Sequence, residues 1–197
     1  MITYITPDGV HYSGNERKDE WFTKEYNEDA SFFDNDSNFK IFLAGTIDNG
    51  DSEDWQKKVL LSLYFMIEPL VRTYGQDYVT PDGKYNVVLY SPRRPDWDSS
   101  WGIDKIEEQI KWEQDKLEKA DLIIMCLQDN SKSPISLLEL GLYGPEGKLI
   151  CFCTPNFYRY SNVKLTCEKW HIPLYETTND GEIADKIYEI LKEIYGN

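Results

Sequence analysis

The stretch DLIIMCLQDNSKSPISLLELGLYG, residues 121–144, has the pattern of a strand, a loop and a helix. Residues 122–127 form a continuous apolar run, which is typical of a strand buried in the middle of a parallel sheet. Ser133 followed by Pro134 is typical of a helix N-cap and first turn. The stretch therefore predicts one strand–helix unit of an α/β fold.

Similar units alternate on both sides of this one. Short apolar runs predict further strands over 39–45, 85–91 and 148–153, with a short edge strand at 171–175. Helical spacing predicts helices over 53–74, 104–120 and from about 180 to 194. The second of these is expected to turn Ile106, Ile110 and Leu117 inward. The alternation predicts a central parallel sheet with helices on both faces, in one domain over residues 39–197.

Residues 1–38 differ from the rest of the chain. They are polar, acidic and rich in aromatic side chains, with little periodicity. The turn signal Pro7-Asp8-Gly9 favours a hairpin or a loose arm in front of the main domain.

The charge of the chain narrows the classes of partner. Its 197 residues carry a formal net charge of −14. Nucleic-acid polymers and anionic membranes require a basic face, so we expect neither as a partner, whereas a small anionic ligand held by a local Arg stays open. The chain has no apolar run of membrane-spanning length, and its first residues lack a signal-peptide pattern. We expect a cytoplasmic protein.

The cysteines and histidines do not have the spacing of a metal site. Cys126, Cys151 and Cys153 lie within apolar runs, where thiols usually serve as small buried hydrophobic groups. His11 and His171 are far apart in the chain, and no two histidines have a ligand spacing. We therefore expect neither a metal nor another cofactor.

Glu139 is the strongest candidate for a functional residue. It is surrounded in the sequence by Leu137, Leu138, Leu140 and Leu142. A buried carboxylate without a partner is costly, so its presence among leucines indicates a use. The helix N-terminus before it is expected to help keep it ionised, as a glycosyl nucleophile requires. The alternative is an amphipathic helix whose Glu139 points to solvent.

The loops after the predicted strands are the expected place of a ligand site, because ligands of open α/β sheets bind outside the carboxyl ends of the strands. Gly45 would allow close approach of the backbone to a ligand, or simply form a tight turn. Arg93 and Arg94 follow a strand, where they could bind a phosphate or carboxylate or else compensate nearby acidic residues. Glu113 is the candidate second carboxylate, with a solvated helix face as its alternative. Asp121 is more typical of a turn than of a catalyst.

Three motifs together resemble the nucleoside 2-deoxyribosyltransferases over residues 39 to about 175. They are Ile41-Phe42-Leu43-Ala44-Gly45-Thr46, then Trp112-Glu113 followed by Ala120-Asp121-Leu122, and Leu138-Glu139-Leu140-Gly141. The resemblance implies a flavodoxin-like three-layer α/β sandwich that exchanges bases on 2-deoxyribose through a covalent glycosyl-enzyme. It also implies a homo-oligomer whose subunits share site residues.

The resemblance implies a role for each matching residue. Glu139 matches the nucleophile and Glu113 the second acid, where the family carries Asp. Phe42 stands where the family has a Tyr that assists the nucleophile. Ser133 stands where transferases carry an Asp for the sugar 5′-hydroxyl and related nucleotide N-glycosidases carry a phosphate-binding Ser. Further candidates for substrate binding are Gly45, Thr46, Asp48, Arg93, Trp112, Asp121 and, matching an Asn that the family takes from a neighbouring subunit, Asn162.

The expected reaction is therefore N-glycosyl transfer on 2-deoxyribonucleosides, with a nucleoside or nucleotide as the small-molecule partner. Two alternatives stay open at the level of sequence. Ser133 and the Arg pair favour a nucleoside 5′-monophosphate N-glycosidase, although Asp48 stands near the place where those glycosidases carry an Arg. Phe42 favours a catalytically inactive module that binds a nucleotide-like ligand.

Overall fold

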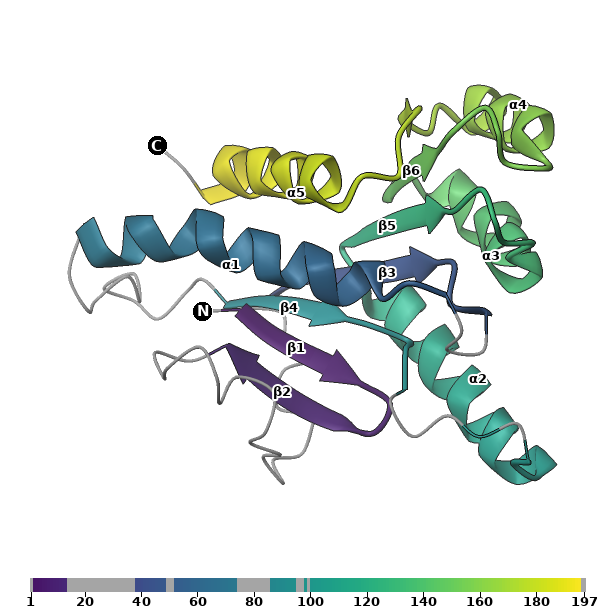
Figure 1. The fold of residues 1–197 in the computed structure, drawn as a ribbon, viewed down its shortest axis with the longest axis horizontal. Helices are drawn as coiled ribbons and strands as arrows, with labels where there is room; N and C mark the ends of the chain where they lie inside the picture. The colour runs from purple at the N-terminus through teal and green to yellow at the C-terminus, as the bar shows by residue number, and fades with distance from the viewer. Residues whose placement is uncertain are drawn as a thin grey trace.

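The strands that the structure describes form one seven-stranded sheet (Figure 1). The computed structural model describes residues 2–13, 38–48, 52–73, 86–94, 98 and 100–195. Neighbouring strands run parallel, except that β1 and β2 form an antiparallel pair. In space their order is β2-β1-β4-β3-β5-β6-β7. The strands are β1 (Ile2–Thr6), β2 (Gly9–Ser13), β3 (Asn38–Gly45), β4 (Asn86–Tyr90), β5 (Leu122–Leu127), β6 (Leu149–Cys153) and β7 (Leu174–Tyr175).

Five of the strands, β3 to β7, have flavodoxin-like connectivity. Numbered in chain order from β3, they lie in the order 2-1-3-4-5, which is the flavodoxin arrangement. The strand order reverses at β3, which lies between β4 and β5, and ligands of such sheets bind outside the carboxyl ends at this point. The α/β three-layer fold predicted from the sequence is confirmed.

Helices cover both faces of this sheet. On one face α1 and α5 lie side by side (Figure 1) and bury Leu63 and Ile187 against the strands. On the other face α2, α3 and α4 bury Leu117, Leu140 and Val163 in a second core. The helices are α1 (Trp55–Thr73), α2 (Ile103–Lys119), α3 (Pro134–Tyr143), a 3-10 turn (Gly144–Glu146), α4 (Tyr160–Trp170) and α5 (Asp180–Tyr195).

The first strand of the N-terminal hairpin belongs to the main sheet. The predicted turn at residues 7–9 connects β1 to β2, and the Thr6 hydroxyl donates to the Asp8 carboxylate at 2.6 Å. β1 pairs with β4 in parallel, from Ile2 beside Val87 onward. Residues 14–37 of the predicted arm lie outside the described part of the chain.

The structure differs from the sequence analysis in two elements on the α2–α4 face. Ile106 and Ile110 were expected to point inward, but 38% and 44% of their surface is exposed. Of the three, only Leu117 is buried in the core. Helix α4 was not predicted, because residues 160–170 carry only Val163 and Cys167 as buried side chains.

All four cysteines are buried and free, so they act as core side chains.

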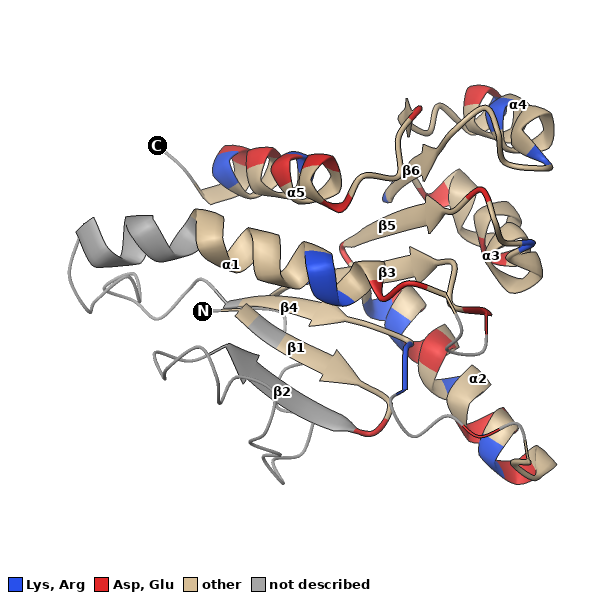
Figure 2. Ribbon diagram, in the orientation of Figure 1, with Lys and Arg blue, Asp and Glu red and all other residues tan. Residues whose placement is uncertain are grey.

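Across the described ranges, none of the helices is both long and apolar enough to cross a membrane. Lys and Arg positions are interspersed with Asp and Glu along α2 and α4, and α5 is rich in acidic positions (Figure 2).

Candidate functional site

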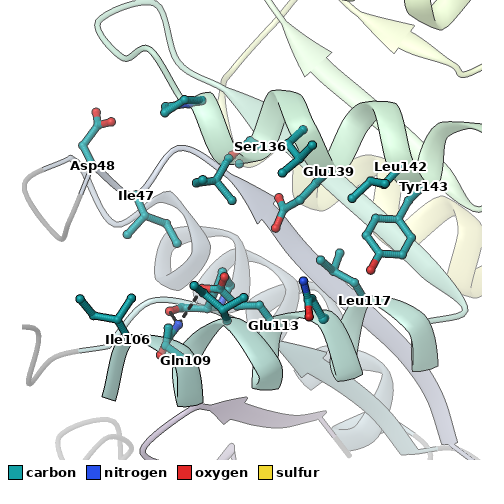
Figure 3. A pocket seen from close by; sticks show the side chains of 18 of the residues that line it. Ile47, Asp48, Ile106, Gln109, Glu113, Leu117, Ser136, Glu139, Leu142 and Tyr143 are labelled. Atoms are coloured by element: carbon teal, nitrogen blue, oxygen red, sulfur yellow. Dashed lines mark hydrogen bonds between the residues drawn. The ribbon is translucent and has the colours of Figure 1, made fainter. Parts of the chain in front are cut away.

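A cavity of about 540 Å³ opens between α2 and α3 at the carboxyl ends of the central strands (Figure 3). Gly45 and Asp48 reach it from the end of β3 and the loop that follows, Arg94 from the segment after β4, and Ser133 from the start of α3. One face of α2 and one face of α3 form its long walls. The cavity therefore lies where the strand order reverses, as expected for a flavodoxin-like sheet.

The two predicted carboxylates line the same cavity. Glu139 projects from α3 and Glu113 from α2 into the space between these helices (Figure 3). Both side chains are half-buried, and the charge of Glu113 acts on Glu139. Two residues 26 positions apart in the sequence are thus neighbours in space, in surroundings that are largely apolar.

Burial raises the pKa of both carboxyl groups. Loss of solvation, reinforced by the charge of Glu113, raises the pKa of Glu139 to about 8. Burial also raises the pKa of Glu113, although a hydrogen bond from Gln109 opposes that rise. Burial therefore opposes the ionised form of Glu139, which the helix N-terminus was expected to favour. Between the two pKa values the pair as a unit holds one proton.

Gly45 has a backbone conformation that other residues rarely adopt. Its φ is +129°, and a Cβ atom there would lie 2.0 Å from the carbonyl oxygen of Cys126. The next residue, Thr46, donates its backbone N–H to the same oxygen at 2.9 Å. Only glycine lets the end of β3 lie this close to β5 while it borders the cavity.

A chain of hydroxyl groups connects the loops after β3 and β5. Ser131 donates to Asp48 Oδ1 at 2.6 Å, and Ser133 lies 2.8 Å from Ser131 and 2.7 Å from Thr46. The proton of Ser131 is committed to the carboxylate, so Ser133 must donate to Ser131 and Thr46 to Ser133. Gln128 donates its backbone N–H to the Thr46 hydroxyl at 2.9 Å. Ser133 is left with only acceptor capacity for a ligand.

The Ser133 side chain does not cap α3, although Pro134 begins the helix as predicted. Ser133 adopts a left-handed conformation with φ of 41°, which turns its hydroxyl to Ser131 and Thr46 instead. Asp48 also has a positive φ, of 47°. Strained backbone of this kind gathers at binding sites, and both of these residues line the cavity.

Phe42 lies in the core and the partly buried Trp112 packs against it, and neither is among the residues that line the cavity. Phe42 is fully buried on β3, and Trp112 packs with its ring centroid 6.2 Å from that of Phe42 and 6.3 Å from that of Tyr90. Thr46 is also fully buried. Its hydroxyl supports Ser133, and its carbonyl accepts from the Trp55 indole at 3.0 Å. These residues support the site from behind.

Arg93 points away from the cavity, whereas Arg94 lines it. The guanidinium of Arg93 donates to the Ser52 carbonyl and hydroxyl at 3.1 and 2.8 Å and to the Glu53 carbonyl at 3.0 Å. It also lies 3.4 Å from the Asp54 carboxylate. Arg93 therefore anchors the start of α1, and Arg94 takes the place that the sequence analysis gave to Arg93.

Asp121 and Asn162 are not among the residues that line the cavity. Asp121 directly precedes β5, at the amino end of that strand and away from the cavity. Its carboxylate accepts from the Lys40 backbone N–H at 2.8 Å. This contact joins β5 to β3 and has a structural role. Asn162 is exposed in the first turn of α4, and its role across a subunit interface stays a prediction.

Several cavity residues were not identified as site residues from the sequence. Gln109 lies one turn before Glu113, and Tyr143 lies one turn after Glu139. Each of these two residues lies four positions from a candidate carboxylate on the same helix, and this spacing could have identified them. Ser131, which does not line the cavity but bonds to Asp48 and Ser133, had no such signal, because its importance depends on the distance between two loops. Within the described residues, no cluster of His, Cys, Asp and Glu could hold a metal ion.

Two comparisons with known proteins bear on the site. No curated protein matches the chain. The family model described as "Nucleoside 2-deoxyribosyltransferase like" matches residues 38–157, the segment that contains Gly45, Glu113, Ser133 and Glu139. This match covers more than half of the chain, so the protein belongs to the nucleoside 2-deoxyribosyltransferase-like family.

Proposed function

We propose that the protein transfers 2-deoxyribose from one nucleobase to another by double displacement. Membership of the family supports an enzyme of glycosyltransferase or glycosidase type. The observation that best supports the proposal is the pair of half-buried carboxyl groups, Glu139 and Glu113, on facing walls of one cavity. Glycosyl chemistry that retains configuration uses two carboxyl groups about 5 Å apart.

In the first step, ionised Glu139 attacks C1′ of a deoxyribonucleoside. The C1′–N bond breaks, its electron pair goes to the base, and Glu113 gives its proton to a base nitrogen. In the second step, an acceptor base loses a proton to Glu113 and attacks C1′, which releases Glu139. Water in place of the acceptor base gives hydrolysis. The pair can share one proton as a unit, and this exchange uses the form in which the proton lies on Glu113 and Glu139 is ionised.

The hydroxyl chain at the end of β3 favours a nucleoside over its 5′-monophosphate. Ser133 faces the cavity as an acceptor, and the Asp48 carboxylate beside it is also an acceptor. Two acceptors suit a donor such as a sugar 5′-hydroxyl, whereas a phosphate dianion finds a like charge and no proton from Ser133.

The nucleotide N-glycosidase is the second candidate, because one observation favours it. Arg94 lines the cavity, and its guanidinium lies 4.8 Å from the centre of the Trp101 ring. A cation at this place could offset the charge of a phosphate. The Asp48 carboxylate opposes it, so we rank this activity below nucleoside transfer.

We expect the deoxynucleoside to be a better substrate than its 5′-monophosphate. Asp48→Asn should narrow the ratio of their kcat/KM values by about tenfold, because it removes a like charge worth about 1.4 kcal/mol. Chromatography of base release, with and without an acceptor base, measures both activities. Asp129→Asn is the matched control, since this exposed carboxylate accepts from the side chains of Thr154 and Asn156. A wild-type preference for the monophosphate would contradict the nucleoside assignment.

We also propose that a second copy of the chain covers the mouth of the cavity. Ile106 and Ile110 on α2 and Ile135, Leu138 and Leu142 on α3 are each more than a third exposed and border the same cavity. Apolar side chains gathered in this way are typical of a protein interface. Light scattering should give at least twice the chain mass of 23.1 kDa. A mass of one chain at micromolar concentration would exclude the shared site.

A further inference from the structure

Gln109 is a buried glutamine one turn before Glu113 on α2. Only 7% of its surface is exposed. Its Nε2 atom donates to Glu113 Oε1 at 2.7 Å and to the carbonyl oxygen of Pro92 at 2.9 Å. Both amide protons are therefore used, and the amide connects the candidate acid to the segment that follows β4.

The orientation of this amide is fixed by its partners. A flipped amide would place Oε1 against a carboxylate and a carbonyl, which are both acceptors. In the orientation that the partners require, Gln109 Oε1 is buried without a hydrogen-bond partner. A buried unpaired acceptor destabilises the fold. The two donated bonds are therefore kept although they leave one buried acceptor unpaired.

We propose that Gln109 is the positioning residue of Glu113, holding one carboxyl oxygen so that the other is presented to the substrate. The inference rests on the proposed glycosyl transfer, in which Glu113 exchanges a proton with the base. The bond to Pro92 fixes the amide relative to the sheet, so the carboxyl group cannot rotate freely toward solvent. Among the described residues, the other titratable or charged groups that line the cavity are Asp48 after β3, Arg94 after β4, and Glu139 and Tyr143 on α3.

The donated bond has a consequence for proton transfer. It stabilises the ionised form of Glu113 and so opposes the rise in pKa that burial causes. Without the donor, the pKa of Glu113 rises further. The pH at which the carboxylate becomes available to take a proton from the acceptor base then rises with it.

The test replaces the amide with apolar side chains. Gln109→Leu and Gln109→Met should each lower kcat by up to about 100-fold with little change in KM, because the acid is no longer held in place. The acid limb of the pH–rate profile should move to higher pH. The melting temperature should change little, because the removal of one unpaired acceptor offsets the loss of the two donated bonds. Two variants of different shape guard against one that fails to fold.

Gln56→Leu is the matched control. Gln56 is also fully buried with one unpartnered atom, Nε2, but it lies on α1 beside Arg93 and is not part of the cavity. Its replacement should leave kcat and the pH–rate profile unchanged. Equal effects in the Gln56 and Gln109 variants would assign Gln109 a merely structural role and overturn the inference.

A second readout does not depend on turnover. Carbon-13 NMR of labelled glutamate carboxyl groups follows the titration of Glu113, which the Glu113→Gln variant assigns. The pKa of Glu113 should rise in Gln109→Leu and stay the same in Gln56→Leu. An unchanged pKa overturns the inference even if the wild-type protein is active. Absence of turnover in the wild type, with the pKa shift present, would instead overturn the proposed function alone.

Discussion

Glu139→Gln abolishes base exchange while the protein stays folded. The amide cannot form the glycosyl ester, so the rate should fall by at least about 10³-fold, in the range seen when other enzymes lose their nucleophile. Stability should rise slightly or stay the same, because a neutral amide replaces a carboxyl group that burial and Glu113 disfavour in its ionised form. Chromatography of the released base and thermal melting measure the two effects.

Glu108→Gln is the control for this substitution. Glu108 is exposed on α2 and is not part of the cavity, so its replacement removes one carboxylate without touching the site. We expect wild-type exchange from this variant. Exchange by Glu139→Gln at more than about a tenth of the wild-type rate would be incompatible with covalent catalysis by this residue.

Glu113→Gln lowers the exchange rate by about 10²-fold to 10⁴-fold, the usual contribution of a general acid. The loss should depend on the leaving group. A 2′-deoxyribonucleoside of an N7-methylated purine departs as a neutral base without protonation, so its cleavage should be largely spared. Comparing this substrate with the unmethylated nucleoside separates the role of an acid from general damage to the cavity.

The same variant should also change the pH dependence. In the wild type, the rate should fall above pH about 8, where the pair loses its last proton. Removal of the Glu113 charge lowers the pKa of Glu139, because one of the two causes that raise it disappears. The alkaline limb should vanish, and Glu139 should be ionised at lower pH than in the wild type. An alkaline limb that persists near pH 8 in Glu113→Gln would mean that another group supplies the proton.

The order of the elements could be predicted from the sequence, because strand and helix periodicity is a local property. The apolar run at residues 122–127 became the central strand β5, and the helix that begins at Pro134 became α3. Helix α4 could not be predicted, since it has only two buried positions. Ile106 and Ile110 border the cavity instead of the core, and this depends on how α2 lies relative to α3, which no local pattern records.

The candidate site was predictable where one residue conflicts with its surroundings. Glu139 among leucines and Gly45 at the end of a strand are conflicts of this kind. The partners of these residues depend on distances between segments far apart in the chain. Arg93 and Arg94 are adjacent and chemically identical, and only the backbone direction after β4 decides that Arg94 lines the cavity. The link from Ser131 to Asp48 spans 83 positions, so it required the folded structure.

The central claim is that Glu139 carries the sugar between two bases. Mass spectrometry of the protein quenched during turnover with a deoxynucleoside, followed by digestion, tests it directly. We predict a peptide containing Glu139 whose mass is increased by one deoxyribosyl group and returns to normal when an acceptor base is added. Base exchange without this modified peptide, or with the sugar on another residue, would contradict the account.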